Sequence, residues 1–217
     1  MSRRGPVQTV SQPEPTISFS RRELRDLGAA WIALGLAFTF FLSRTATFRF
    51  GANPSMETFL GLLGPLTESL LTVGLGFLLH ELAHKVVAVR FGQLAEFRAD
   101  YGMLGLAMAA GLAGFLFAAP GAVHHRGYIT PRENGLIALA GPLTNIGLAI
   151  LFLPLLLLPA PLAGIGSLGV AINLLLAAFN MIPFGPLDGR KVLDWSPVVF
   201  GVVFLPSAAL ALFVFFA

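Results

Sequence analysis

The stretch Leu79-His80-Glu81-Leu82-Ala83-His84 decides how this chain folds and what it can do. It places two histidines and a glutamate within residues 66–89, a run otherwise apolar enough for a membrane-spanning helix. On a helix, His80 and His84 lie one turn apart on the same face, a spacing at which two imidazoles can bind one metal ion. Glu81 lies beside them, where its carboxylate could take a proton from water at the metal. Because ionisable groups at membrane depth are costly and functional by default, this pattern predicts a metal site within a bilayer.

The composition is that of a membrane protein. Of the 217 residues, 56% are hydrophobic and only 12% are charged, whereas soluble domains carry about 25% charged residues. The sequence contains no cysteine, so no disulfide can form and a transition metal must be bound by His, Asp or Glu. The net charge of +3 comes from basic residues whose placement indicates membrane orientation, and we expect no nucleic-acid partner.

Five apolar runs predict an all-α polytopic membrane protein, a bundle of about five to six membrane segments. The runs cover residues 27–42, 66–89, 136–158, 162–182 and 195–217. Between the second and third runs, residues 96–101 and 122–129 have strand character and predict a small β element. The Gly-rich apolar segment 103–119 lies between these strands, and we expect it to be re-entrant.

The N-terminal part is predicted to lie outside the membrane. Residues 1–18 are rich in Pro, Ser and Gln, as in a mobile tail. Ser20 and Glu23 form a capping-box pattern that predicts a helix starting near Arg21. We therefore divide the chain into a cytoplasmic tail with an interfacial helix, residues 1–26, and a single membrane-embedded domain, residues 27–217. A further strand-like stretch covers residues 45–50.

A third metal ligand is needed, because a catalytic zinc usually keeps three protein ligands and one open position. Asp188 is the candidate, since it follows an apolar span after two prolines that would turn the backbone inward. The alternative interpretation is a turn aspartate at a helix boundary. His84 and Asp188 each lie near the end of an apolar run, so they can share one depth only if the chain crosses the membrane an even number of times between them. This condition requires segment 103–119 to return to the side of the membrane that it leaves.

The basic residues provide an independent test of this topology. With the N-terminus in the cytoplasm and segment 103–119 returning, every Lys and Arg except Arg44 and Arg49 lies inside. If the segment crossed the membrane, four of these residues would move outside: Arg126, Arg132, Arg190 and Lys191. The positive-inside rule therefore favours the returning segment. We expect a multi-pass protein of the cell membrane whose metal site lies toward the cytoplasm.

These motifs resemble the site-2 protease family, zinc metalloproteases that cleave proteins inside membranes. The family pattern is HExxH, then a Gly-Pro span, then Asn-x-x-Pro and Leu-Asp-Gly. This chain matches it at residues 80–84, at Gly141-Pro142, at residues 180–183 and at residues 187–189. The resemblance covers residues 66–191, the expected catalytic core of the membrane-embedded protease domain, and is to the short prokaryotic members.

The resemblance implies a set of roles for these residues. His80, His84 and Asp188 would hold one Zn²⁺, and Glu81 would be the catalytic base. The activity implied is that of an intramembrane endopeptidase in regulated intramembrane proteolysis. Its partners would be the lipid bilayer and a transmembrane protein substrate.

Two amides on apolar helices, Asn145 and Asn180, have two possible roles. They could stabilise the oxyanion or grip the substrate backbone, or they could form interhelical hydrogen bonds, which are common in membrane bundles. A second metal site at His124 and His125 is disfavoured, because no acidic residue is close in sequence.

The alternative function is a membrane metal-ion transporter that uses the HELAH helix as its transport site. A transporter should carry further His or Asp ligands on a neighbouring span, but the two remaining histidines lie in a loop-like region. An inactive relative is a third possibility, and it should lack Glu81 or a ligand, none of which is missing. The strand-like pieces around Phe97 and Val123 could pair with an unwound substrate by β-addition.

Overall fold

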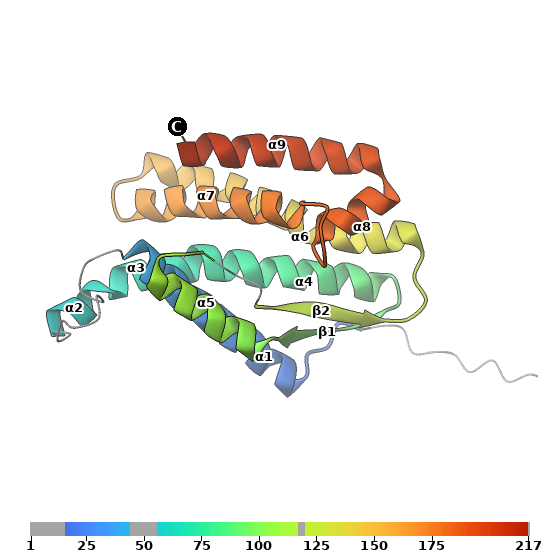
Figure 1. Cartoon of the computed structure of the whole chain (residues 1–217), viewed down its shortest axis with the longest axis horizontal. Helices are drawn as coiled ribbons and strands as arrows, with labels where there is room; N and C mark the ends of the chain where they lie inside the picture. Colours follow the sequence, from blue (N-terminus) through green and yellow to red (C-terminus); the bar gives the residue numbers. More distant parts are fainter. Residues whose placement is uncertain (1–15, 44–55, 117–119, 217) are drawn as a thin grey trace, which may run out of the picture.

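The computed structural model describes residues 16–43, 56–116 and 120–216, and its elements are arranged in layers (Figure 1). The elements in chain order are α1 Arg21–Leu42, α2 Met56–Gly61, α3 Leu63–Ser69, η2 Leu70–Gly74, α4 Leu75–Arg90, β1 Leu94–Ala99, α5 Tyr101–Ala113, β2 Gly121–Arg126, α6 Pro131–Phe152, η3 Leu153–Leu157, α7 Leu162–Asn180, α8 Asp188–Trp195 and α9 Pro197–Phe216. The predicted tail up to residue 15 and the predicted strand at residues 45–50 lie outside the described residues.

Five helical stretches in the described part of the chain are long and apolar enough to cross a membrane. They are Arg21–Leu42, Leu63–Arg90, Pro131–Leu157, Leu162–Asn180 and Pro197–Val214. The single sheet in the described residues has two strands, β1 and β2. The prediction of an all-α polytopic bundle with a small β element is confirmed, and the chain is a multi-pass membrane protein.

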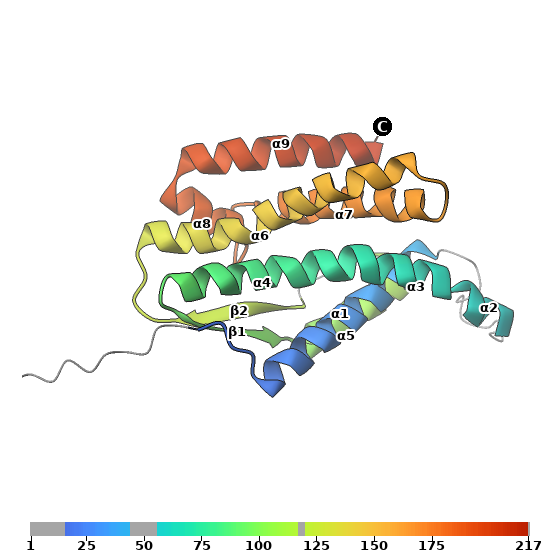
Figure 2. The same ribbon diagram turned by 180° about the vertical axis from the view of Figure 1, so that it is seen from behind.

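Helix α4 runs through the middle of the molecule. On one side of it lie α6 and α7, with α9 beyond them; on the other lie the sheet, α1 and α5 (Figures 1 and 2). Helix α4 packs against α6, and α1 packs against α5. The core between α1, α4 and the sheet includes Leu34, Phe77 and Phe97. The HELAH residues of α4 therefore lie between the two halves of the bundle.

The segment between the strands begins and ends at one end of the sheet. Ala99 is paired with Gly121 across the antiparallel ladder, and Asp100 N donates to the carbonyl of Pro120 at 3.0 Å. Helix α5 has 13 residues, about 20 Å, which is shorter than the roughly 30 Å hydrocarbon core. The re-entry of this segment into the membrane stays a prediction.

Strand β1 ends two residues earlier than predicted, because a helix starts there. The Asp100 side chain accepts a hydrogen bond from Met103 N at 3.0 Å and caps α5. An aspartate three residues before a backbone donor is a common N-cap arrangement. The alternating pattern at residues 96–101 therefore includes the N-cap and the first residue of a helix.

Helix α1 begins at Arg21 as predicted, but the expected capping box is only half formed. The Ser20 hydroxyl accepts a hydrogen bond from Glu23 N at 3.0 Å. The Glu23 carboxylate instead accepts hydrogen bonds from Lys85 Nζ at 2.6 Å and from Phe97 N at 3.0 Å. Glu23 and Lys85 are each only 1% exposed, so a buried ion pair joins α1 to the HELAH helix.

Candidate metal centre

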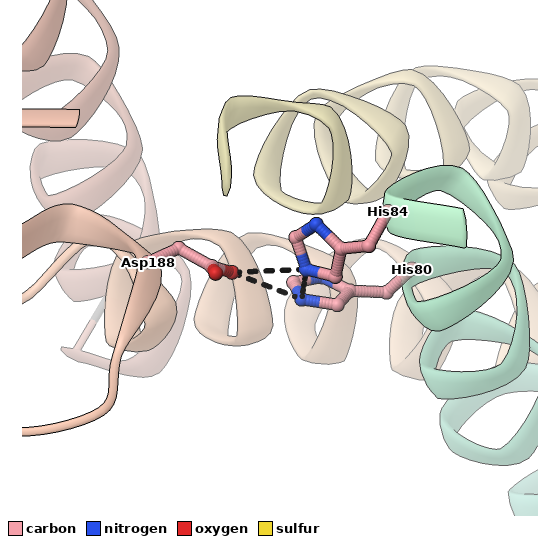
Figure 3. Close-up of side chains that lie close together, drawn as sticks. All are labelled: His80, His84 and Asp188. Carbon is pink, nitrogen blue, oxygen red and sulfur yellow. Dashed lines mark hydrogen bonds and ion pairs between the residues drawn. The ribbon is translucent and has the colours of Figure 1, made fainter. Parts of the chain in front are cut away.

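His80 and His84 point from α4 to the same place. They are buried, at 4% and 7% exposed, and their Nε2 atoms lie 3.0 Å apart. The rings are at 85° to each other, so each nitrogen faces a common point from a different direction (Figure 3). The i, i+4 spacing on one helix turn produces this arrangement directly.

Asp188 completes the group from the start of α8. Its Oδ2 lies 3.3 Å from His80 Nε2 and 3.1 Å from His84 Nε2 (Figure 3). Gly189 allows this position, because a Cβ at residue 189 would lie 2.0 Å from the carbonyl oxygen of Met181. Leu-Asp-Gly can therefore pack its backbone against the end of α7 and turn the carboxylate toward α4.

The three ligand atoms lie close to the separations expected around a tetrahedral zinc ion. Nitrogen and oxygen ligands at about 2.0–2.2 Å from zinc lie roughly 3.3–3.6 Å from one another, and the three observed separations, 3.0 to 3.3 Å, are at or slightly below this range. The residues present therefore fit one Zn²⁺ bound by two neutral imidazoles and one carboxylate.

Helix α6 forms the wall opposite the two imidazoles. A Cβ at Gly141 would lie 2.5 Å from His80 Nε2 and 2.6 Å from His84 Nε2. The glycine of the Gly-Pro motif is therefore explained by its contacts, because it lets α6 approach the ligand atoms without covering them. An alanine at this position would occupy the space that a metal ion needs.

Each histidine is oriented through its second ring nitrogen. His80 Nδ1 lies 2.6 Å from Asn145 Oδ1, and His84 Nδ1 lies 2.7 Å from the carbonyl oxygen of Ile137. Both acceptors require a proton on Nδ1, which leaves Nε2 of each ring free to bind metal. Helix α6 supplies both acceptors.

Asn145 is fully engaged inside the protein. Besides contacting His80, its Nδ2 donates to the carbonyl of Gly76 at 3.1 Å and to Asn173 Oδ1 at 2.9 Å. Asn145 and Asn173 are both 0% exposed. Asn145 therefore forms the interhelical hydrogen bonds of one of the two roles considered for it, and its Oδ1 faces His80.

Glu81 lies next to the ligands without being one of them. It is 7% exposed, and its Oε2 accepts a hydrogen bond from Val123 N of β2 at 3.1 Å. The outer edge of β2 therefore reaches the residue predicted to be the catalytic base. This contact links the small sheet to the metal centre.

Asn180 and the second histidine pair are not brought into the ligand group. Asn180 lies at the end of α7, and its Nδ2 donates to the Leu176 carbonyl of the same helix at 3.0 Å. Within the described residues, His80, His84 and Asp188 are the one set of three close enough to hold a metal ion. His124 pairs with Glu96 across the sheet ladder.

Two supporting features were missed in the sequence. The carbonyl of Ile137 is a backbone group and has no signal in the side-chain pattern. The Lys85–Glu23 pair did have one, because a lysine that directly follows HELAH within an apolar span requires a buried partner. That requirement could have led to Glu23.

The geometry defines a membrane protein with a buried His-His-Asp metal centre and an adjacent glutamate. No protein-family model matches the chain, and no solved structure matches it significantly. A curated protein of Methanocaldococcus jannaschii, named "Putative zinc metalloprotease MJ0611", is 42% identical over 203 residues, covering 91% of this chain and 97% of the relative. A protein of Bacillus subtilis, named "Putative zinc metalloprotease YwhC", is 33% identical over 147 residues, covering 57% of this chain and 66% of the relative.

The chain belongs to the zinc metalloprotease family that these relatives represent. Zinc is accordingly its metal cofactor, and the group His80, His84 and Asp188 matches that metal in donor type and spacing.

Proposed function

We propose that the protein is an intramembrane zinc endopeptidase that hydrolyses peptide bonds within or near transmembrane segments of membrane proteins, a site-2 protease of the short type. One observation carries this proposal: two of the three ligands, His80 and His84, are buried on a helix long and apolar enough to span a membrane. A metalloprotease centre in that position meets substrates that are themselves in the bilayer. Hydrolysis of their backbone would be a step in regulated intramembrane proteolysis.

The residues around the centre would have separate roles in peptide hydrolysis. Bound zinc would supply a Lewis acid that polarises the scissile carbonyl and makes water a better nucleophile. The Glu81 carboxylate would accept a proton from the attacking water and deliver it to the nitrogen of the leaving amine. Asn145 and Ile137 would keep the imidazoles in the required tautomer throughout the reaction.

An extended substrate would pair with the outer edge of β2. The Phe97–Val123 pair directs both N–H groups away from the ladder, toward Glu23 and Glu81 respectively. Glu23 therefore occupies the outer edge of β1, and Glu81 occupies the outer edge of β2 at Val123. The next outward N–H of β2 is that of His125, which the register pairs with Ala95. We propose β-addition at β2 through this N–H, next to the predicted base, and abandon it at β1.

The proposed orientation places the N-terminus and the metal centre toward the cytoplasm of the cell membrane. The basic residues support it through the positive-inside rule, and so does the pairing of Ala99 with Gly121, which brings the two ends of the intervening segment together. A metal-ion transporter remains the competing function. Within the described residues no second group of three ligands follows the first, and a transport path would require one.

The direct test of the proposed function is Glu81→Gln in the purified protein, reconstituted with a membrane protein substrate. We expect cleavage to fall by at least about 10²–10⁴-fold, the usual contribution of a general base, while Zn²⁺ stays bound at one ion per chain. Glu68→Gln, on the same membrane-spanning stretch but in α3, is the matched control and should cleave normally. Cleavage by Glu81→Gln at the wild-type rate would refute the mechanism.

A further inference from the structure

The membrane-spanning stretch that carries the metal ligands contains one turn that is not α-helical. Between α3 and α4 lies η2, a π-helical turn of five residues, Leu70–Gly74. The N–H of Leu75 reaches back five residues to the carbonyl of Leu70, one residue further than in an α-helix. A turn with one additional residue changes the rotation between the two flanking helices by about 100° relative to an uninterrupted α-helix.

Trp31 of α1 holds this turn in place. Its indole Nε1 donates to the carbonyl oxygen of Leu70 at 3.0 Å, the same oxygen that accepts from Leu75. Two glycines make the close packing possible: a Cβ at Gly74 would lie 2.4 Å from the indole ring, and a Cβ at Gly35 would lie 2.4 Å from the Leu70 side chain. An indole donor, the widened turn and two glycine contacts therefore fit together as one joint.

The joint lies directly before the catalytic residues. His80, Glu81 and His84 all follow Gly74 on α4, whereas α3 lies before the turn. His80 and His84 must face Asp188 and Gly141 at the same time, which one rotation of α4 allows. We propose that the π-helical turn, held by the Trp31 indole, sets the rotation of α4 that turns His80 and His84 toward Asp188. Trp31 is therefore a positioning residue, an inference that rests on the zinc centre of the proposed function.

The first test removes the indole donor and keeps an aromatic ring. In Trp31→Phe the carbonyl of Leu70 loses its second donor, the turn relaxes toward α-helical geometry, and α4 rotates relative to α3. We expect the affinity for Zn²⁺, measured on purified protein by competition with a chelator, to fall about ten- to a hundredfold, as for loss of other groups that orient metal ligands.

The second test asks whether rotation is the cause. Deleting Leu71 leaves Leu75 four residues after Leu70, so the same N–H and carbonyl can pair in an ordinary α-turn and the two flanks keep their rotation. The deletion should restore the affinity for Zn²⁺ in the Trp31→Phe protein. Leu79 provides the matched deletion, because Leu71 and Leu79 are leucines of the same spanning stretch, 39% and 37% exposed. Deleting Leu79 leaves HELAH intact but removes one residue between the π-helical turn and His80, which rotates the ligands by about 100° relative to the turn. This deletion should therefore abolish zinc binding.

Each outcome decides the proposal. Wild-type zinc affinity in Trp31→Phe, or a loss that the Leu71 deletion does not restore, would overturn it. If Trp31→Phe does not fold, the two deletions in the wild-type background decide, and equal loss of zinc in both would overturn the proposal. Because zinc affinity requires no peptide substrate, these results are independent of whether the protein cleaves within the membrane.

Discussion

His80 depends on a chain of amides that extends from α4 through α6 to α7. Asn145 accepts from His80 and donates to Asn173, and Asn173 in turn donates to the carbonyl of Gly169 at 2.9 Å. At membrane depth no water replaces a lost partner, so removal of one member leaves the others unsatisfied. The residue that holds the ligand is therefore also a link between three helices.

Asn145→Ala should weaken zinc binding without touching a ligand atom. Loss of the acceptor frees the His80 ring to rotate and to change tautomer, and we expect the affinity for Zn²⁺ to fall about ten- to a hundredfold. Chelator competition measures this change. Asn180→Ala is the control, because that amide nitrogen donates within its own helix, and its zinc affinity should equal the wild-type value. Wild-type affinity in Asn145→Ala would contradict the orienting role.

At this scale the sequence predicted the identity of the ligands but not their support. Metal coordination restricts residue type and spacing, so HELAH and the later Asp188 could be recognised as a group. An asparagine such as Asn145 can serve a substrate or a neighbouring helix equally well, and its type alone does not decide between them. The Ile137 carbonyl belongs to the backbone, which every residue possesses.

Among the elements, the small sheet connects distant parts of the chain. Glu23 of α1 occupies the outer edge of β1, and Glu81 of α4 accepts from the outer edge of β2. The strands were predictable from their alternating pattern, since one face packs on Phe77 and the other is polar. The π-helical turn was not, because residues 70–74 are as apolar as any α-helical span and the turn depends on Trp31 from another helix.

His125→Pro, compared with His125→Ala, tests whether β2 receives the substrate, because the Val123 N–H already hydrogen-bonds Glu81. Relative to alanine, proline at this position removes one outer-edge N–H and leaves the ladder bonds to β1, so kcat/KM should fall about tenfold, mainly through KM, for the loss of one or two hydrogen bonds. Zinc content should be unchanged. Ala95→Pro removes an N–H from the outer edge of β1 and is the matched control, expected to cleave normally. Equal effects of the two proline substitutions would argue against β-addition at β2.

For the whole molecule, the open question is on which side of the membrane each loop lies. Asp188 and His84 meet at one point, so the proposed topology requires the segment between β1 and β2 to return to the side of the membrane that it leaves. Cysteine labelling can test this, since the chain has no cysteine of its own. Gly121 before α6 and Gly189 after α7 lie in the chain segments whose side must be determined, but they cannot accept a cysteine. A Cβ at Gly121 would lie 2.3 Å from the Arg98 carbonyl oxygen, and a Cβ at Gly189 would lie 2.0 Å from the Met181 carbonyl oxygen.

Exposed positions are better probes of this topology. Tyr128 is 92% exposed before α6, Arg190 lies on α8 with a side chain 60% exposed, and Leu157 is 88% exposed between α6 and α7. In intact cells treated with an impermeant maleimide, Leu157→Cys should be labelled, whereas Tyr128→Cys and Arg190→Cys should react only after the membrane is opened. If the segment between β1 and β2 crossed the membrane fully, all three results would be reversed. The same reversal would place Asp188 at the side of the membrane opposite to His84, because Arg190 and Asp188 belong to one short helix. The three ligands could then not meet.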